Sequence, residues 1–319
     1  MEIKSGSVVA MAGGVGGAKL AHGLYAQAND RDLTVIVNTA DDFELHGLHI
    51  SPDLDTVLYT LAGVANPETG WGIAGDTFAT MSALARLGGA DWFRLGDQDF
   101  ATHIRRTQRL REGATLGEVT AEFSRALGVL DTTAIVPMTD DPVATLVETD
   151  DGLLDFQSYF VRRQHADRVL SVRFSGIEAA TLAPRAKQAL TAASVIVLCP
   201  SNPIVSIGPI LALSGTTDAL SSANAPIVAV SPIIGGQALK GPADHMLASL
   251  GHHVSALGVA TIYRHFLSGM VIDDADAHLA RPIGRLGMSV LVTDTIMRSE
   301  LDRRRLATEV LEFAGALRR

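Results

Sequence analysis

The chain has 319 residues, of which 47% are hydrophobic, which is enough for a large core in one domain or in two interlocked domains. The formal net charge of −9 argues against general nucleic-acid binding, which usually needs a basic face. The single cysteine, Cys199, excludes an intramolecular disulfide framework and a cysteine zinc cluster.

The N-terminal segment, residues 1–6, lacks the pattern of a signal peptide. No apolar run in the chain approaches the roughly 20 residues that a membrane helix needs. We therefore expect a cytoplasmic protein that has neither a membrane partner nor a nucleic-acid partner.

The first predicted elements are a strand over residues 7–11, a glycine turn at Gly13–Lys19 and a helix to about residue 25. Glycines bring backbone N–H groups close to an anion, and the helix N-terminus adds a partial positive charge. The turn departs from the dinucleotide fingerprint, because Lys19 stands at the third glycine, and from the Walker loop, because Leu20 follows that lysine. We favour a nucleotide or diphosphate ligand over a turn that binds nothing.

Two pairs of acidic residues follow the second predicted strand, residues 33–37, which ends at Asn38. Single carboxylates in such places are often solvated, and Asp53 or Asp55 could cap the helical run at 57–61. Four carboxylates in a short segment repel one another unless a cation balances them. The sequence therefore predicts a Mg²⁺ site formed by Asp41, Asp42, Asp53 and Asp55.

The middle of the chain has a different pattern. Helices are predicted at 79–87 and 101–111, and the four arginines of the second helix form either a solvated face or a clamp for anions. Alternating residues at 146–148 and 156–159 predict antiparallel strands between residues 137 and 173. We interpret residues 75–183 as an inserted α+β subdomain that covers the ligand face.

Residues 1–74 and 184–319 are predicted to form a Rossmann-like nucleotide-binding core, of class α/β, with a mostly parallel sheet and helices on both faces. The strand predicted at 195–199 ends in Ser201 and Asn202, which offer polar groups where α/β folds bind ligands. Cys199 lies inside that apolar run and is predicted to be a core residue. Further strands are predicted near residues 227–230, 271–273 and 290–292, before a C-terminal helix from about residue 299.

Eight short motifs follow one another along nearly the whole chain: Gly13–Lys19, Asn38–Asp42, Pro52–Thr56, Trp71–Gly72, Leu95–Asp97, Thr102–His103, Ser201–Pro203 and Ser231–Ile234. Together they closely resemble the 2-phospho-L-lactate transferase family of coenzyme F-420 biosynthesis. The resemblance implies a magnesium-dependent, dimeric enzyme that uses a guanosine-diphosphate-linked donor. Its expected reaction moves phospholactate, phosphoenolpyruvate or phosphoglycerate to the deazaflavin Fo (7,8-didemethyl-8-hydroxy-5-deazariboflavin), giving coenzyme F-420-0 or a variant and GMP.

The motifs fit this chemistry, which needs neutralised phosphates, a stabilised leaving group and an alcohol held in line. The residues expected to hold the guanosine diphosphate part are Gly13, Gly14, Gly16, Gly17, Lys19, Asn38, Ser201, Asn202 and Ser206. The resemblance places Asp55 and Arg94 near Fo, and Asp55 and Asp42 are the expected catalytic residues. Trp71, Trp92 and Phe93 are expected either to flank the deazaflavin or to pack in the core.

One departure concerns Gln98, which stands where the family pattern Gly-Asp-Arg-Asp has its arginine. Glutamine cannot replace the fixed charge and paired donors of arginine, so we hypothesise that Gln98 alters the choice of donor. Which of the three donors is used, and which aspartate is the base, stay open.

Two other functions compete with the transferase. A nicotinamide-dependent oxidoreductase would place Asp41 or Asp42 on a ribose, but the third glycine is missing and the acids at 52–56 have no role. A non-enzymatic nucleotide sensor would bind a phosphorylated ligand without turnover, and it has less need of a metal site.

Overall fold

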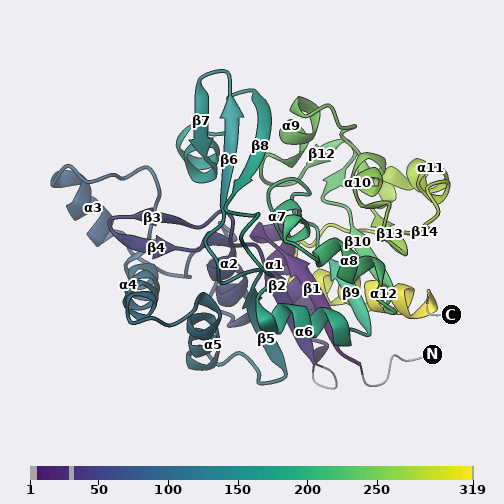
Figure 1. Cartoon of the computed structure of the whole chain (residues 1–319), viewed down its shortest axis with the longest axis horizontal. Helices are drawn as coiled ribbons and strands as arrows, with labels where there is room; N and C mark the ends of the chain where they lie inside the picture. The colour runs from purple at the N-terminus through teal and green to yellow at the C-terminus, as the bar shows by residue number, and fades with distance from the viewer. Residues whose placement is uncertain (1–5, 29–31, 318–319) are drawn as a thin grey trace.

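The computed structural model describes residues 6–28 and 32–317. In this part of the chain the centre of the fold is a seven-stranded sheet in the order β14-β13-β10-β9-β1-β2-β5, with every neighbouring pair parallel (Figure 1). Its strands are β1 (Val8–Ala12), β2 (Leu33–Val37), β5 (Thr133–Pro137), β9 (Val195–Leu198), β10 (Ile227–Val230), β13 (Gly269–Ile272) and β14 (Ser289–Val292). This is the doubly wound order of a Rossmann fold, and it reverses direction between β1 and β9. The predicted α/β class is confirmed.

Helices cover both faces of the sheet, because successive side chains of a strand point to opposite faces and both sets are apolar. In β1, Val9 and Met11 pack into one core, while Val8, Ala10 and Ala12 pack into the other. The first core is covered by α6 (Pro184–Ala192), α7 (Ile207–Ala212), α8 (Thr216–Ser221), α9 (Ala243–Ser249), α10 (Ala256–Tyr263) and α11 (Ala280–Gly284). The second is covered by α1 (Gly14–Tyr25), α2 (Pro52–Leu61), α5 (Leu116–Ala126) and α12 (Glu300–Ala316).

The remaining elements surround the C-terminal ends of the strands. The hairpin of β3 (Phe43–Leu45) and β4 (Leu48–Ile50) extends to the left in Figure 1 beside α3 (Ala79–Arg86) and α4 (Asp97–Arg111). An antiparallel sheet, β7-β6-β8, stands at the top and consists of β6 (Ala144–Thr149), β7 (Gly152–Asp155) and β8 (Val169–Ser175). Short elements complete the fold: η2 (Ser158–Arg162), β11 (Ile233–Ile234), β12 (Gln237–Ala238) and η3 (Asp274–Leu279).

Two sequence predictions need correction in the middle of the chain. Strand β5 lies within 75–183 but pairs with β2 along its whole length, so it belongs to the central sheet rather than to an insertion. Its five residues are all buried, as expected for a strand of a covered parallel sheet. The antiparallel strands are confirmed for β6 to β8, but residues 156–159 are helical, and Phe156 and Tyr159 form a small core with Val147.

The helices of the described residues are too short or too polar for any of them to cross a membrane.

Candidate active site

A cavity of about 710 Å³ opens at the C-terminal ends of the parallel strands. Residues after β1, β9 and β14 line one side, among them Gly14, Ser201 and Met297. Phe93 and Phe160, which come from the segments between β2 and β9, line it as well. The cavity therefore lies at the point where the strand order reverses, which is where doubly wound folds bind their ligands.

The glycine turn after β1 forms part of the cavity wall. Gly14 has a φ of 63°, in the left-handed region that favours glycine. At Gly16 a side chain would collide with the carbonyl oxygen of Pro200, which follows β9. The hydroxyl of Ser201 accepts the N–H of Gly13 at 3.1 Å and donates to the Gly13 carbonyl at 2.9 Å. The loops after β1 and β9 are thus joined across the reversal point.

Of the glycines predicted to contact the donor, Gly13, Gly14 and Gly16 line the cavity, whereas Gly17 is buried and is not among the lining residues. Asn202 and Ser206 also line it. The side-chain oxygen of Asn202 accepts the N–H groups of Ile204 and Val205, at 2.9 and 3.4 Å, so it also shapes its own loop.

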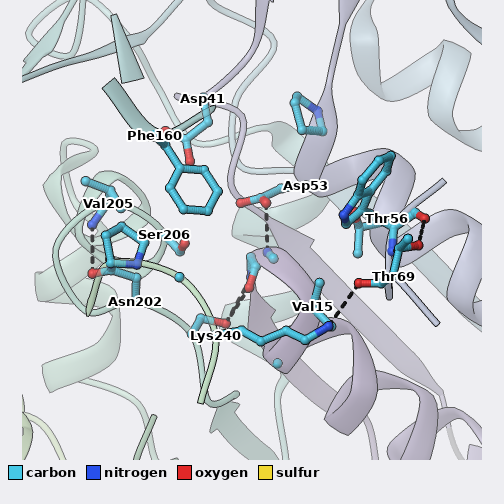
Figure 2. Close-up of a pocket in the computed structure, with 18 of the residues that line it drawn as sticks. Val15, Asp41, Asp53, Thr56, Thr69, Phe160, Asn202, Val205, Ser206 and Lys240 are labelled. Carbon is cyan, nitrogen blue, oxygen red and sulfur yellow. Dashed lines mark hydrogen bonds between the residues drawn. The ribbon is translucent and has the colours of Figure 1, made fainter. Parts of the chain in front are cut away.

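Asp53 and Asp41 face each other across Asn38. Asp53 Oδ1 accepts the N–H of Gly14 at 2.7 Å, so this carboxylate satisfies a donor at the start of α1 (Figure 2). Asn38 Nδ2 lies 3.0 Å from both Asp53 Oδ2 and Asp41 Oδ2. Asp41 Oδ1 is buried and has no hydrogen-bond partner among the described residues. Asn38 was predicted to contact the donor, but it is fully buried and instead holds the two carboxylates together.

The electrostatics of this pair favour a cation. Burial, followed by the nearby Asp53 carboxylate, raises the pKa of Asp41 well above its ordinary value. Burial likewise raises the pKa of Asp53 from 3.8 to about 6. Because two buried carboxylates are costly to ionise together, a hard divalent cation would relieve both the desolvation and the repulsion. The unpartnered oxygen of Asp41 supplies a free ligand atom, so this pair fits Mg²⁺.

Asp42, one of the predicted metal ligands and catalytic residues, points elsewhere. Its Oδ2 accepts the hydroxyl of Ser51 at 2.7 Å and lies 3.0 Å from His49 Nε2. Asp42 is not among the residues that line the cavity. The helix-cap alternative for Asp53 and Asp55 is also wrong, because the N-cap position of α2 is Ser51 and the two acids lie in the first turn.

Asp55 lines the cavity but is paired with a buried arginine from α4. Both of its oxygens accept N–H groups of Arg106: the Nη1–Oδ2 distance is 3.0 Å, and Nη2 reaches Oδ1. His103 Nδ1 lies 3.3 Å from the same Nη1, and His103 Nε2 lies 3.2 Å from Asp99 Oδ1. The hydroxyl of Tyr59 donates to Asp99 Oδ1 at 2.7 Å. We call Asp55, Tyr59, Asp99, His103 and Arg106 the α2–α4 network.

Most of this network was not evident from the sequence. Arg106 stayed open between a solvated face and an anion clamp, and Tyr59, Asp99 and His103 had no predicted chemical role. The signal that could have found them is the spacing of Asp99, His103 and Arg106, which places all three on one face of a helix. The other arginines of α4 are solvent-facing, and Arg109 pairs with Glu112 and Glu122.

Two lysines lie on the side of the cavity nearest α1. Lys19 Nζ donates to the carbonyl of Met297 at 3.0 Å. Lys240 Nζ donates to the carbonyl of Thr69 at 2.9 Å (Figure 2). Burial, followed by the positive charges of Arg303 and Lys240, lowers the pKa of Lys19. Neither lysine pairs with a carboxylate among the described residues, so an anion at the start of α1 would be attracted by both.

The predicted aromatic residues Trp71, Trp92 and Phe93 all line the cavity. Arg94 lines it too, and its guanidinium carbon lies 4.1 Å from the centroid of the Phe78 ring. The side chain of Gln98 is exposed and is not among the lining residues, so the structure provides no contact through which it could select the donor.

In the metal-free protein we expect stability to rise as the pH falls from about 7 towards 5. The pKa of Asp53 is about 6 when folded against an ordinary value of 3.8, so the folded state takes up a proton that the unfolded chain does not. One pKa unit corresponds to about 1.4 kcal/mol, and pH 5 lies about one unit below the folded pKa of this group, so its gain between pH 7 and 5 is about 1 kcal/mol.

The gain is measured by urea unfolding of the wild type and of Asp53→Asn at several pH values between 7 and 5. At each pH the free energy of unfolding of the variant is subtracted from that of the wild type. Saturating Mg²⁺ should abolish the pH dependence of this difference. A difference that is flat in the metal-free proteins would contradict the expectation.

Comparison with known proteins gives a consistent result. The family model described as 2-phospho-L-lactate transferase CofD matches residues 8–305. The chain is 40% identical over 304 residues to a 2-phospho-L-lactate transferase of Methanothermobacter thermautotrophicus, with 95% of this chain and 97% of that protein covered. It is 42% identical over 320 residues to a phosphoenolpyruvate transferase of Streptomyces coelicolor, with 98% and 99% covered.

Among solved structures, a UPF0052-family protein of Bacillus halodurans superposes with a TM-score of 0.63 at 15% identity, covering 97% of this chain and 100% of that one. At this identity the likeness concerns the fold alone.

Proposed function

The chain belongs to the 2-phospho-L-lactate transferase CofD family, and from this premise we propose that it transfers a phospho-carboxylate unit from a guanosine-diphosphate-linked donor to the deazaflavin Fo. The products would be coenzyme F-420-0 or a variant and GMP. The observation that carries the proposal is the arrangement of the cavity. A glycine turn and two lysines lie beside a pair of carboxylates, and an aromatic wall accompanies them.

The donor would place its diphosphate over the start of α1. There the amide groups of the glycine turn and the charges of Lys19 and Lys240 attract phosphate oxygens. Asn202 and Ser206 line the adjacent wall, which suits the guanosine part. Asp41 and Asp53 would hold Mg²⁺, which when bound neutralises phosphate charge and stabilises the departing GMP.

The acceptor would lie on the side of Trp71, Trp92 and Phe93, whose apolar faces suit a planar deazaflavin. Its ribityl hydroxyl would attack the phosphorus that carries the carboxylate unit, the bond from that phosphorus to the oxygen of GMP would break, and the hydroxyl proton would be lost to a cavity carboxylate or to water. Asp55 lines the cavity and keeps lone pairs for a hydrogen bond from the hydroxyl, since each oxygen accepts only one N–H from Arg106.

The chain is almost equally identical to a 2-phospho-L-lactate transferase and to a phosphoenolpyruvate transferase, so the proposal includes both of these donors. It also includes the phosphoglycerate-linked donor. The test is to incubate the protein with Fo, Mg²⁺ and each guanosine-diphosphate-linked donor, and to measure GMP and the phosphodiester product. Release of GMP that requires both Fo and one of the donors supports the proposal. Absence of product with all three donors overturns it.

Two controls separate the competing functions. Under the proposal NAD should not bind, whereas Fo should bind and change its fluorescence. A sensor would bind the donor but release no GMP. The family resemblance also leads us to propose a homodimer, which sedimentation equilibrium measures directly.

A further inference from the structure

The Asp55–Arg106 pair is buried in the wall of the cavity. Asp55 is 5% exposed and Arg106 is 2% exposed, and they come from α2 and α4. The paired contacts match the planar fork of a guanidinium to the two oxygens of a carboxylate, which is the most directional ion pair that side chains form. The charge of Asp55 is therefore already balanced within the protein.

This distinguishes Asp55 from two other acids that line the cavity, Asp41 and Asp53. Asp41 and Asp53 share the amide of Asn38, and no cation of the described residues pairs with either of them. A divalent ion placed at Asp55 would have to approach the fixed positive charge of Arg106, and like charges in a buried site repel strongly. Asp41 and Asp53 are therefore better placed than Asp55 to hold a metal ion.

The remaining members of the α2–α4 network hold the arginine in place. A guanidinium only donates, so in the 3.3 Å contact between Arg106 Nη1 and His103 Nδ1 the imidazole nitrogen accepts. His103 Nε2 lies 3.2 Å from Asp99 Oδ1. Tyr59 donates to the same oxygen of Asp99. His103 thus contacts Arg106 on one side and lies beside Asp99 on the other, so it supports the position of Arg106.

We propose that Arg106 is a positioning residue that withholds Asp55 from the metal and presents it to the acceptor alcohol. The second half of this statement rests on the proposed function, and the first half does not. Under this proposal, no residue on the side of the cavity that receives the acceptor binds the metal, and the metal lies on the side that binds the donor.

The claim that Asp55 does not bind the metal is tested with Mn²⁺, whose free concentration is measured by electron paramagnetic resonance. Replacing both partners, Asp55→Asn with Arg106→Gln, removes the two charges together and avoids leaving a buried charge unpaired. We expect this double variant to bind Mn²⁺ within about twofold of the wild type, and Asp53→Asn to bind it at least about 10-fold more weakly. A loss in the double variant as large as that in Asp53→Asn would show Asp55 to be a metal ligand and overturn the proposal.

The claim that Asp55 is presented to the acceptor alcohol is tested by fluorescence titration with Fo. The double variant should bind Fo about 10- to 100-fold more weakly, because an amide replaces the charged acceptor. Its KM for Fo should rise while its KM for the donor stays unchanged. Arg106→Lys keeps the charge but loses the paired geometry, so its affinity for Fo should fall between those of the double variant and the wild type.

Arg109→Gln is the matched control, because Arg109 lies on the same helix but pairs with surface glutamates. It should keep its affinity for Fo within about twofold, as expected for a surface change. A melting temperature of the double variant close to that of the wild type shows that weaker binding is not unfolding. A folded double variant with wild-type affinity for Fo overturns the proposal. If the wild type itself does not bind Fo, the proposed function fails, and the Mn²⁺ titration still decides whether Asp55 is withheld from the metal.

Discussion

Replacing Asp53 by asparagine should reduce the rate of GMP release by about 100- to 1,000-fold, the scale of losing one fixed electrostatic contact to a reacting phosphate. In the protein Asp53 accepts two N–H donors, from Gly14 and from Asn38. An asparagine has a single acceptor oxygen, so one of these donors would face an NH₂ group instead. The substitution thus removes a proposed metal ligand and also loosens the start of α1. Steady-state kinetics at several Mg²⁺ concentrations measure both effects.

Asp140→Asn is the matched control for this prediction. Asp140 also accepts a backbone N–H near a helix start, that of Gly117 at 2.8 Å, but it is exposed and not among the residues that line the cavity. Its replacement should change the rate by less than about twofold, since surface substitutions have small effects. Equal losses in the two variants would mean that the effect of Asp53 is structural and would contradict a role at the metal.

Gly16→Ala is the second substitution with a large expected effect. The added methyl group would collide with the carbonyl oxygen of Pro200, so the turn after β1 must move away from the loop after β9. Overpacking of this kind costs about 1–3 kcal/mol. Because the same two loops line the donor side of the cavity, the KM for the donor should rise more than the KM for Fo. Urea unfolding and kinetics with each substrate varied in turn check the two parts.

Gly284→Ala controls for the chemistry of the substitution. Gly284 ends α11, and an added Cβ there has no atom within 4 Å. This variant should differ from the wild type by less than about 0.5 kcal/mol in free energy of unfolding and should keep both KM values. If Gly16→Ala behaved in the same way, the close approach of the two loops would not be needed for donor binding.

The parts of the site that the sequence predicted are those encoded locally. The glycine turn between β1 and α1 is a short pattern whose geometry follows from the residues themselves. Asp41 and Asp53 could be placed near this turn. Asp41 follows strand β2 and Asp53 lies at the start of helix α2, and both of these ends lie at the same edge of the sheet as the turn. The choice between Asp41 and its neighbour Asp42 could not be made this way, since adjacent side chains point in different directions and only the surrounding partners decide which one reaches the cavity.

The parts that escaped prediction depend on contacts between distant segments. Asp55 and Arg106 are 51 residues apart, and nothing in either local pattern indicates that they meet. Strand β5 was recognisable as apolar, but its place beside β2 is a matter of long-range pairing. The helical turn at 156–159 alternates like a strand, yet Phe156 and Tyr159 pack on the same small core.

By itself the sequence determined the α/β class, the glycine turn after the first strand and the family, because short-range periodicity and ordered motifs carry that information. Only the tertiary structure decided how the aspartates are divided: Asp41 and Asp53 share Asn38, Asp42 joins His49 and Ser51, and Asp55 pairs with Arg106. The physical reason is that a buried carboxylate takes its character from the donor or cation that faces it, and those partners come from elements far away in the chain.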